Sequence, residues 1–178
     1  HQVEKYNNFV NDSLKIDTIA GRLIVHSEKD SKDSKDSKDS KDSKVKLLGI
    51  SPGASYGSAK RWYPKEFADV AIDLSRHYDI VILGGPGEKK IANDIEKLLI
   101  EKGVDNYHNL VGKTSIKELI SNISNLDLFI TGDSGPMHLA AALQVPTVSI
   151  FGPTRANETS QWMNESSVIV KKNLKCQP

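Results

Sequence analysis

A polar turn at residues 131–138, Thr-Gly-Asp-Ser-Gly-Pro-Met-His, holds the groups best suited to bind an anion. It follows the apolar run 128–130 and precedes the small-residue run 140–143, an order typical of a strand that leads into a helix. Proline suits the first turn of that helix, where no backbone donor is needed. The free amides around Gly135 to His138 would then face the turn with the positive end of the helix dipole. The turn is therefore predicted to bind a nucleotide diphosphate.

Two side chains give this turn further chemistry. A carboxylate repels a diphosphate, so we expect Asp133 to accept hydrogen bonds from backbone amides or from a sugar hydroxyl. His138 lies one turn into the predicted helix and can donate to a phosphate oxygen. A purely structural alternative also fits, in which Asp133 or Ser134 caps the helix and His138 packs in the core.

Gly-Asp-Ser-Gly at 132–135 is also the nucleophile signature of chymotrypsin-like serine proteases. Those proteases are all-β and disulfide-linked, whereas this segment is flanked by α/β signals and the chain has one cysteine. A nucleophile elbow requires glycine two residues on either side of the serine, and Pro136 takes the second of those positions. Both hydrolytic interpretations are therefore disfavoured.

The loops after other predicted strands also carry groups that suit phosphate and sugar. Residues 52–64 combine two glycines and several hydroxyls with Lys60 and Arg61, whose charges can offset those of a departing diphosphate. Glu88 follows a glycine-rich loop and can accept from ribose hydroxyls, and Thr114 ends a Gly-Lys-Thr turn. Loops after parallel strands emerge at one edge of the sheet, so these groups are expected to gather there. The alternative for the two cations is a solvated pair.

Alternating apolar and amphipathic runs place these loops in an α/β fold. Strands are predicted at residues 45–51, 79–83, 106–111, 126–131 and 147–151. Helices are predicted from Pro64, through residues 91–99, from Ser115 and after the 131–138 turn. The third helix has Ser115 and Glu118 at capping-box spacing and is expected to bury Ile116, Leu119, Ile120 and Ile123. This order predicts a Rossmann-like parallel sheet with helices on both faces.

The first 44 residues differ from the rest. Apolar side chains recur at helical spacing over residues 1–14, which predicts an amphipathic docking or linker helix, and residues 23–25 form a short strand-like run. Residues 29–44 repeat Lys-Asp-Ser without an apolar side chain, so this tract is expected to be a solvated, disordered loop. We therefore divide the chain into 1–26 (helix and short leading strand), 27–44 (low-complexity loop) and 45–178 (nucleotide-binding lobe).

Composition excludes several classes of protein. The 24 basic and 23 acidic residues give a net charge of +1, which provides no field to attract nucleic acid or an anionic membrane. One cysteine excludes a disulfide framework and fits a reducing compartment, and neither a metal-ligand cluster nor a membrane-spanning run is found. Walker and Gly-x-Gly-x-x-Gly motifs are absent, which argues against P-loop NTPases and dehydrogenases. The chain lacks an initial methionine and a closing element, so we expect a piece of a longer protein.

Two motifs together carry a family resemblance. Pro-Gly-Ala at 52–54, Gly57 and Ala-Lys-Arg-Trp at 59–62 are followed about seventy residues later by Asp-Ser-Gly-Pro-Met-His at 133–138. Phe-Gly-Pro-Thr follows at 151–154. In this order and spacing they closely resemble the carboxyl-terminal half of heptosyltransferase II, the ADP-heptose:lipopolysaccharide heptosyltransferases of Gram-negative bacteria. The similarity covers most of residues 45–154.

The resemblance implies the second lobe of a GT-B glycosyltransferase, which binds the nucleotide-sugar donor. The family transfers L-glycero-D-manno-heptose from ADP-heptose to the first heptose of the lipopolysaccharide inner core, with inversion and without an obligatory metal or other cofactor. It implies a cytoplasmic enzyme, peripheral to the inner face of the inner membrane. The acceptor and the general base would belong to the first lobe, which this chain lacks. A non-catalytic nucleotide-binding module and a related protein heptosyltransferase stay open as alternatives.

The resemblance also assigns residues. Ser55 and Tyr56 match the diphosphate loop, Lys60 matches the diphosphate-binding lysine with Arg61 beside it, Glu88 matches a ribose-binding glutamate, Thr114 falls near the nucleoside pocket, and Asp133, Ser134, Gly135 and His138 match the donor-binding turn. Lys60 would stabilise the leaving diphosphate. The sequence departs from the family in the extra residue Tyr63, in the Lys-Asp-Ser tract and in ending shortly after Cys176.

Overall fold

The computed structural model describes residues 1–25, 45–54 and 57–172, and six parallel strands form its sheet in the order β3-β2-β1-β4-β5-β6. The strands are β1 (Lys46–Ser51), β2 (Tyr78–Ile82), β3 (Tyr107–Asn109), β4 (Leu128–Gly132), β5 (Thr147–Phe151) and β6 (Ser167–Lys171). The chain winds outward from β1 to β3 and then returns to β4, which pairs with β1 on its other side. The strand order therefore reverses between β1 and β4, where ligands bind in sheets of this kind.

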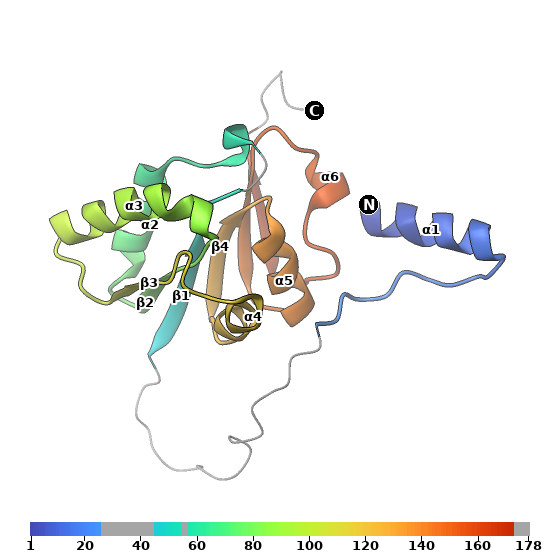
Figure 1. Ribbon diagram of the computed structural model, residues 1–178, viewed down its shortest axis with the longest axis horizontal. Helices are drawn as coiled ribbons and strands as arrows, with labels where there is room; N and C mark the ends of the chain where they lie inside the picture. The colour runs from blue at the N-terminus through green and yellow to red at the C-terminus, as the bar shows by residue number, and fades with distance from the viewer. Residues whose placement is uncertain (26–44, 55–56, 173–178) are drawn as a thin grey trace, which may run out of the picture.

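Helices cover both faces of the sheet (Figure 1). On one face lie α2 (Pro64–Leu74) and α3 (Lys89–Glu101), which bury Phe67 and Ile95 against the strands. On the other lie α4 (Ile116–Ser124) and α5 (Gly135–Leu143), which pack around Phe129 of β4. Strands buried on both sides need apolar residues on both sides, which is why they read as continuous apolar runs. The predicted Rossmann-like architecture is confirmed.

Local signals set the helix boundaries. Pro64 opens α2, and Ser115 caps α4 by accepting a hydrogen bond from the Glu118 amide at 3.2 Å. The Glu118 carboxylate in turn accepts from the Ser115 amide at 2.7 Å, so the predicted capping box is confirmed. The predicted burial of Ile116 is wrong, because this side chain is 75% exposed. Ile116 is the first residue of α4 and belongs to none of the three clusters of buried apolar residues, so helical periodicity overestimates burial at a helix end.

Three strand predictions need correction. β6 was not predicted, although its apolar residues 168–170 pair in register with β5. The third strand is shorter than the predicted 106–111, since only Tyr107–Asn109 pairs with β2. The strand predicted at 23–25 is wrong, because these residues have no regular secondary structure and no strand accepts them as a neighbour. A short apolar run becomes a strand only where a sheet edge is available to it.

Helix α1 (Gln2–Leu14) has the bounds expected from its periodicity but buries no residue. Its Tyr6 and Phe9 side chains are each 70% exposed. The helix extends away from the sheet and approaches the lobe with its first turn, next to α6 (Ala156–Thr159) (Figure 1). The Lys-Asp-Ser tract lies outside the described residues. The division of the chain at residues 26 and 44 stays a prediction.

The core makes a direct stability prediction. Phe67 is 1% exposed and packs edge-on against Trp62 with ring centroids 5.2 Å apart. Phe67→Ala should lower the free energy of unfolding by about 3 to 5 kcal/mol, because a cavity replaces the ring. Ile116→Ala is the matched control and should change it by less than about 0.5 kcal/mol. Urea denaturation followed by circular dichroism measures both, and similar losses in the two variants would contradict the assignment of the core.

Candidate functional site

A cavity of about 330 Å³ opens where β1, β4 and β5 end. Its lining residues come from the loops and short helical segments that follow these three strands: Ala54, Lys60, Asp133, Ser134, Gly135, His138 and Thr159. The cavity lies at the reversal of strand order, where two loops diverge to opposite faces of the sheet. Lys60 and the start of α5 therefore face a common space, as the edge rule predicts.

A short 3₁₀ helix, η1 (Ser58–Lys60), carries Lys60 across the ends of β4 and β5. Its backbone comes close to both strands. A Cβ at Gly132 would lie 3.3 Å from the carbonyl oxygen of Lys60, and one at Gly152 would lie 3.5 Å from that of Ala59. Glycine at these two strand ends leaves room for the approach.

Lys60 and Asp133 form an ion pair, with 2.8 Å between Nζ and Oδ2. The Asp133 side chain is 7% exposed and that of Lys60 is 27% exposed. Asp133 was expected to accept from backbone amides or a sugar hydroxyl, whereas its described donors are the Lys60 ammonium and, at 3.5 Å, the Thr159 hydroxyl. The physical reason is burial, because a carboxylate out of water is stable only beside a cation or strong donors.

Among the described residues, no side chain caps the start of α5. Ser134 occupies the cap position in an extended conformation, but its hydroxyl contacts the Thr131 hydroxyl at 3.2 Å and makes no capping hydrogen bond. The positive end of the α5 dipole at Gly135 thus faces the cavity uncapped. An all-parallel sheet excludes the chymotrypsin-like interpretation of this turn, since those proteases are all-β.

His138 lies one turn further along α5 and is half-buried. Burial lowers the pKa of its imidazole, the nearby Lys60 ammonium lowers that pKa further, and the Asp133 carboxylate opposes both. The ring is therefore neutral at pH 7 and carries one N–H donor. It lines the cavity and can donate that hydrogen bond to a bound oxygen without bringing a second cation.

Glu88 lies at the same sheet edge but does not line this cavity. It ends the short helix η2 (Pro86–Glu88), and its carboxylate accepts from the Gly85 amide at 2.7 Å. The carboxylate fills the space beside Gly53 and Gly84, where any side chain would collide with it. Glu88 thus packs the loop after β2 against the loop after β1, at Gly53.

Two other predicted residues, Arg61 and Thr114, do not line the cavity. Arg61 donates from Nε and Nη2 to the carbonyl oxygen of Ala54 at 3.1 and 2.9 Å, so its guanidinium fastens the loop after β1. Thr114 lies in the turn after β3 and does not line the cavity. Ser55 and Tyr56 lie outside the described residues.

Thr159 is a site residue that sequence reasoning missed. It belongs to α6, which follows β5, and it both lines the cavity and approaches Asp133. The edge rule pointed to the loop after β5, but the sequence did not show that the chain turns back to the cavity five residues after Thr154. A short polar helix leaves too weak a periodic signal for such a prediction.

The described residues contain neither a metal-ligand cluster nor a membrane-spanning helix. In residues 1–25, 45–54 and 57–172, no three His, Cys, Asp or Glu side chains gather into a group that could hold a metal ion. Over the same part of the chain, no helix has the length and apolar character needed to cross a membrane.

The six-stranded parallel sheet and its edge cavity define one lobe of the GT-B type, and comparison with known proteins gives the family. The chain belongs to glycosyltransferase family 9 (heptosyltransferase), whose family model matches residues 1–178. It is 44% identical to lipooligosaccharide heptosyltransferase 2 of Campylobacter jejuni subsp. jejuni, over 100% of this chain and 54% of that protein. The chain thus spans about half the length of the curated relatives that it matches over its whole length. The resemblance seen in the two motifs is confirmed.

Solved structures agree. The structure of ADP-heptose lps heptosyltransferase II from E. coli superposes with a TM-score of 0.70 and 29% identity, covering 76% of this chain and 41% of that one. The E. coli heptosyltransferase WaaC with ADP shares the fold at a TM-score of 0.61 and 19% identity, covering 72% and 39%.

His138 gives a prediction about pH. Because burial lowers the pKa of the folded imidazole, the unfolded chain binds more protons as the pH falls through the ordinary histidine range. Protonation therefore favours unfolding. Between pH 7.5 and about pH 5, the free energy of unfolding should therefore fall less in His138→Gln than in the parent chain. Above pH 7.5 the difference in unfolding free energy between the two chains should no longer change with pH. Urea denaturation in matched buffers measures this, and equal losses would show that burial does not govern this ring.

Proposed function

We propose that the chain is the donor-binding half of an inverting heptosyltransferase and that the Lys60 cavity binds the diphosphate of ADP-heptose. The complete enzyme transfers L-glycero-D-manno-heptose to the first heptose of the lipopolysaccharide inner core. The observation that carries the proposal is the common cavity of Lys60 and the uncapped start of α5. Membership of the family, and a structure of the same fold solved with ADP, support it.

The cavity offers three kinds of donor to a diphosphate. The Lys60 ammonium has three N–H groups, so it can keep one on Asp133 and direct the others to phosphate oxygens. The first amides of α5 add the positive end of a helix dipole. Neutral His138 adds a hydrogen bond from the next turn. Asp133 then positions the Lys60 ammonium and does not itself contact the phosphate.

The reaction is an in-line displacement at the anomeric carbon. The acceptor hydroxyl oxygen forms the new bond while the bond to the β-phosphate oxygen breaks, and the electron pair leaves with ADP. Lys60 and the start of α5 stabilise the charge that develops on the departing diphosphate. The proton of the acceptor goes to a general base, which we place in the acceptor-binding lobe because Asp133 is already bound to Lys60.

The remaining assignments follow the family resemblance. Glu88 accepts hydrogen bonds from the ribose hydroxyls, the region of Thr114 binds the nucleoside, and Ser55 and Tyr56 contact the diphosphate. Arg61 contributes by fastening the loop that holds Lys60. No resident metal or other cofactor is needed for this chemistry. We place the enzyme in the cytoplasm, at the inner face of the inner membrane, where the lipopolysaccharide acceptor is bound mainly by the first lobe.

Lys60→Ala tests the proposal. In the complete enzyme it should cut turnover by more than about tenfold, because the cation that offsets the leaving diphosphate is lost. In this chain it should weaken ADP binding by a similar factor, measured by isothermal titration calorimetry. Lys65→Ala, which removes an exposed cation of α2 paired with Asp69, is the control and should leave both quantities unchanged.

Unchanged turnover in the Lys60→Ala enzyme would show that Lys60 does not act on the leaving diphosphate. ADP binding without any heptose transfer by the complete enzyme would instead favour a non-catalytic nucleotide-binding module. The transfer assay uses ADP-heptose with a lipopolysaccharide inner-core acceptor.

A further inference from the structure

We propose that Thr159 is a positioning residue of the Lys60 cavity and that helix α1 fixes its placement through α6. The inference rests on the proposed function, since it takes the cavity to bind the ADP diphosphate. It concerns a residue that lies outside both motifs of the family resemblance, on the segment after β5.

The Thr159 hydroxyl lies between two acceptors. Its Oγ1 is 3.3 Å from the carbonyl oxygen of Arg155 and 3.5 Å from Oδ2 of Asp133. The hydroxyl has one proton, so it donates to one of these acceptors at a time. Rotation about the Cβ–Oγ1 bond turns that proton from the carbonyl oxygen to the carboxylate. Thr159 also lines the cavity together with Lys60.

This second donor acts when an anion enters. The Lys60 ammonium is the short partner of Asp133, at 2.8 Å, and the carboxylate is 7% exposed. A diphosphate draws the ammonium towards its own oxygens and weakens that bond. A buried carboxylate without a donor is costly, so the Thr159 hydroxyl keeps Asp133, and through it Lys60, in position.

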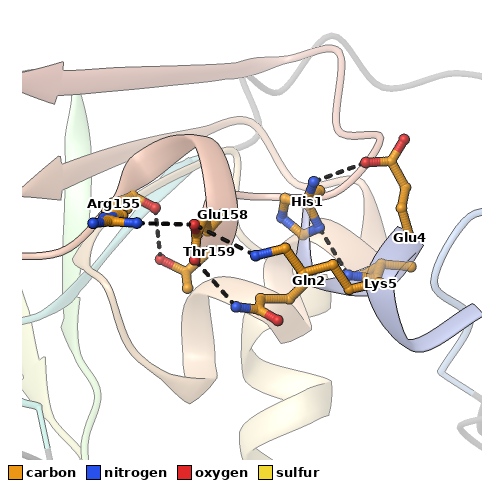
Figure 2. A network of polar contacts seen from close by, with 8 residues as sticks. His1, Gln2, Glu4, Lys5, Arg155, Glu158 and Thr159 are labelled. Carbon is orange, nitrogen blue, oxygen red and sulfur yellow. Dashed lines mark hydrogen bonds and ion pairs between the residues drawn. The ribbon is translucent and has the colours of Figure 1, made fainter. Parts of the chain in front are cut away.

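The placement of Thr159 depends on α6, a helix of only four residues. So short a helix is not stable by itself. Its Glu158 carboxylate is held at three points, by Arg155 at 3.4 Å, by Gln2 at 3.2 Å and by Lys5 at 3.5 Å (Figure 2). Two of these three partners belong to the beginning of α1.

The segment just after α6 is tied to α1 as well. Nε2 of His1 lies 2.9 Å from the carbonyl oxygen of Ser160, and the His1 ring stacks at a tilt on Trp162 with centroids 4.7 Å apart. Trp162 donates its indole N–H to the carbonyl oxygen of Gly21 at 2.9 Å. Residues 158–162 are thus held by the start of α1 and by the chain that follows it, so a shift of α1 moves Thr159 relative to Asp133.

ADP titrations by calorimetry on the 178-residue chain test the proposal. Thr159→Val removes the hydroxyl at nearly constant volume and should weaken ADP binding about tenfold, as for one lost hydrogen bond to a charged group. Thr159→Ser keeps the hydroxyl and should stay within about twofold of the parent chain. Glu158→Gln weakens the hold of α1 on α6 and should cost about threefold.

Asp69→Asn is the matched control, because it breaks an exposed ion pair on α2 and should not change ADP affinity. Thermal unfolding midpoints identify any variant that has lost its fold. Parent-like binding by Thr159→Val, or equal weakening by Thr159→Ser, would overturn the role of the hydroxyl. Parent-like binding by Glu158→Gln would overturn the link to α1. A parent chain that binds no ADP would refute the proposed function itself, and this inference with it.

Discussion

The ion pair between Lys60 and Asp133 is the interaction on which the candidate site depends. It joins the loop after β1 to the turn after β4, and it satisfies a carboxylate that is almost fully buried. The two loops meet because β1 and β4 are neighbours in the sheet. Along the chain they are far apart, since α2, β2, α3, β3 and α4 lie between the loop after β1 and the strand β4. Glycines at the ends of β4 and β5 let the backbone of η1 come close enough for the pair to form.

This pair also explains how one site can hold a carboxylate and still suit an anion. Asp133 engages one donor of the ammonium, and the other two remain able to bind an anion in the cavity that Lys60 lines. The start of α5 contributes its dipole because Ser134 makes no capping bond, and His138 contributes a donor without a charge. The positive character of the cavity thus comes from one lysine and a set of backbone amides, which fits a chain whose net charge is only +1.

Much of this architecture follows from the sequence, because it is encoded locally. The apolar runs predicted the strands β1 to β5, although β3 is shorter than expected. The Ser115 capping box was predicted correctly, and the edge rule placed Lys60 and the 131–138 turn at one cavity. What escaped prediction depends on distant partners. Sequence spacing did not reveal that Asp133 pairs with Lys60, that Thr159 returns to the cavity, or that Arg61 turns to Ala54. The run at 23–25 resembled a strand as closely as β6 does, but only β6 has a neighbour to pair with.

The outer strand β6 has a consequence for handling this lobe. Its Val168, Ile169 and Val170 side chains are 42 to 56% exposed, and β5 is the only strand of the described residues that pairs with it. An apolar, unpaired sheet edge is a template on which a second polypeptide can add a strand, the first step towards aggregation. Lys171 and Lys172 close the strand with two charges, which act as gatekeepers against such growth. Salt screens these two charges, so a higher ionic strength weakens the protection that they give to this edge.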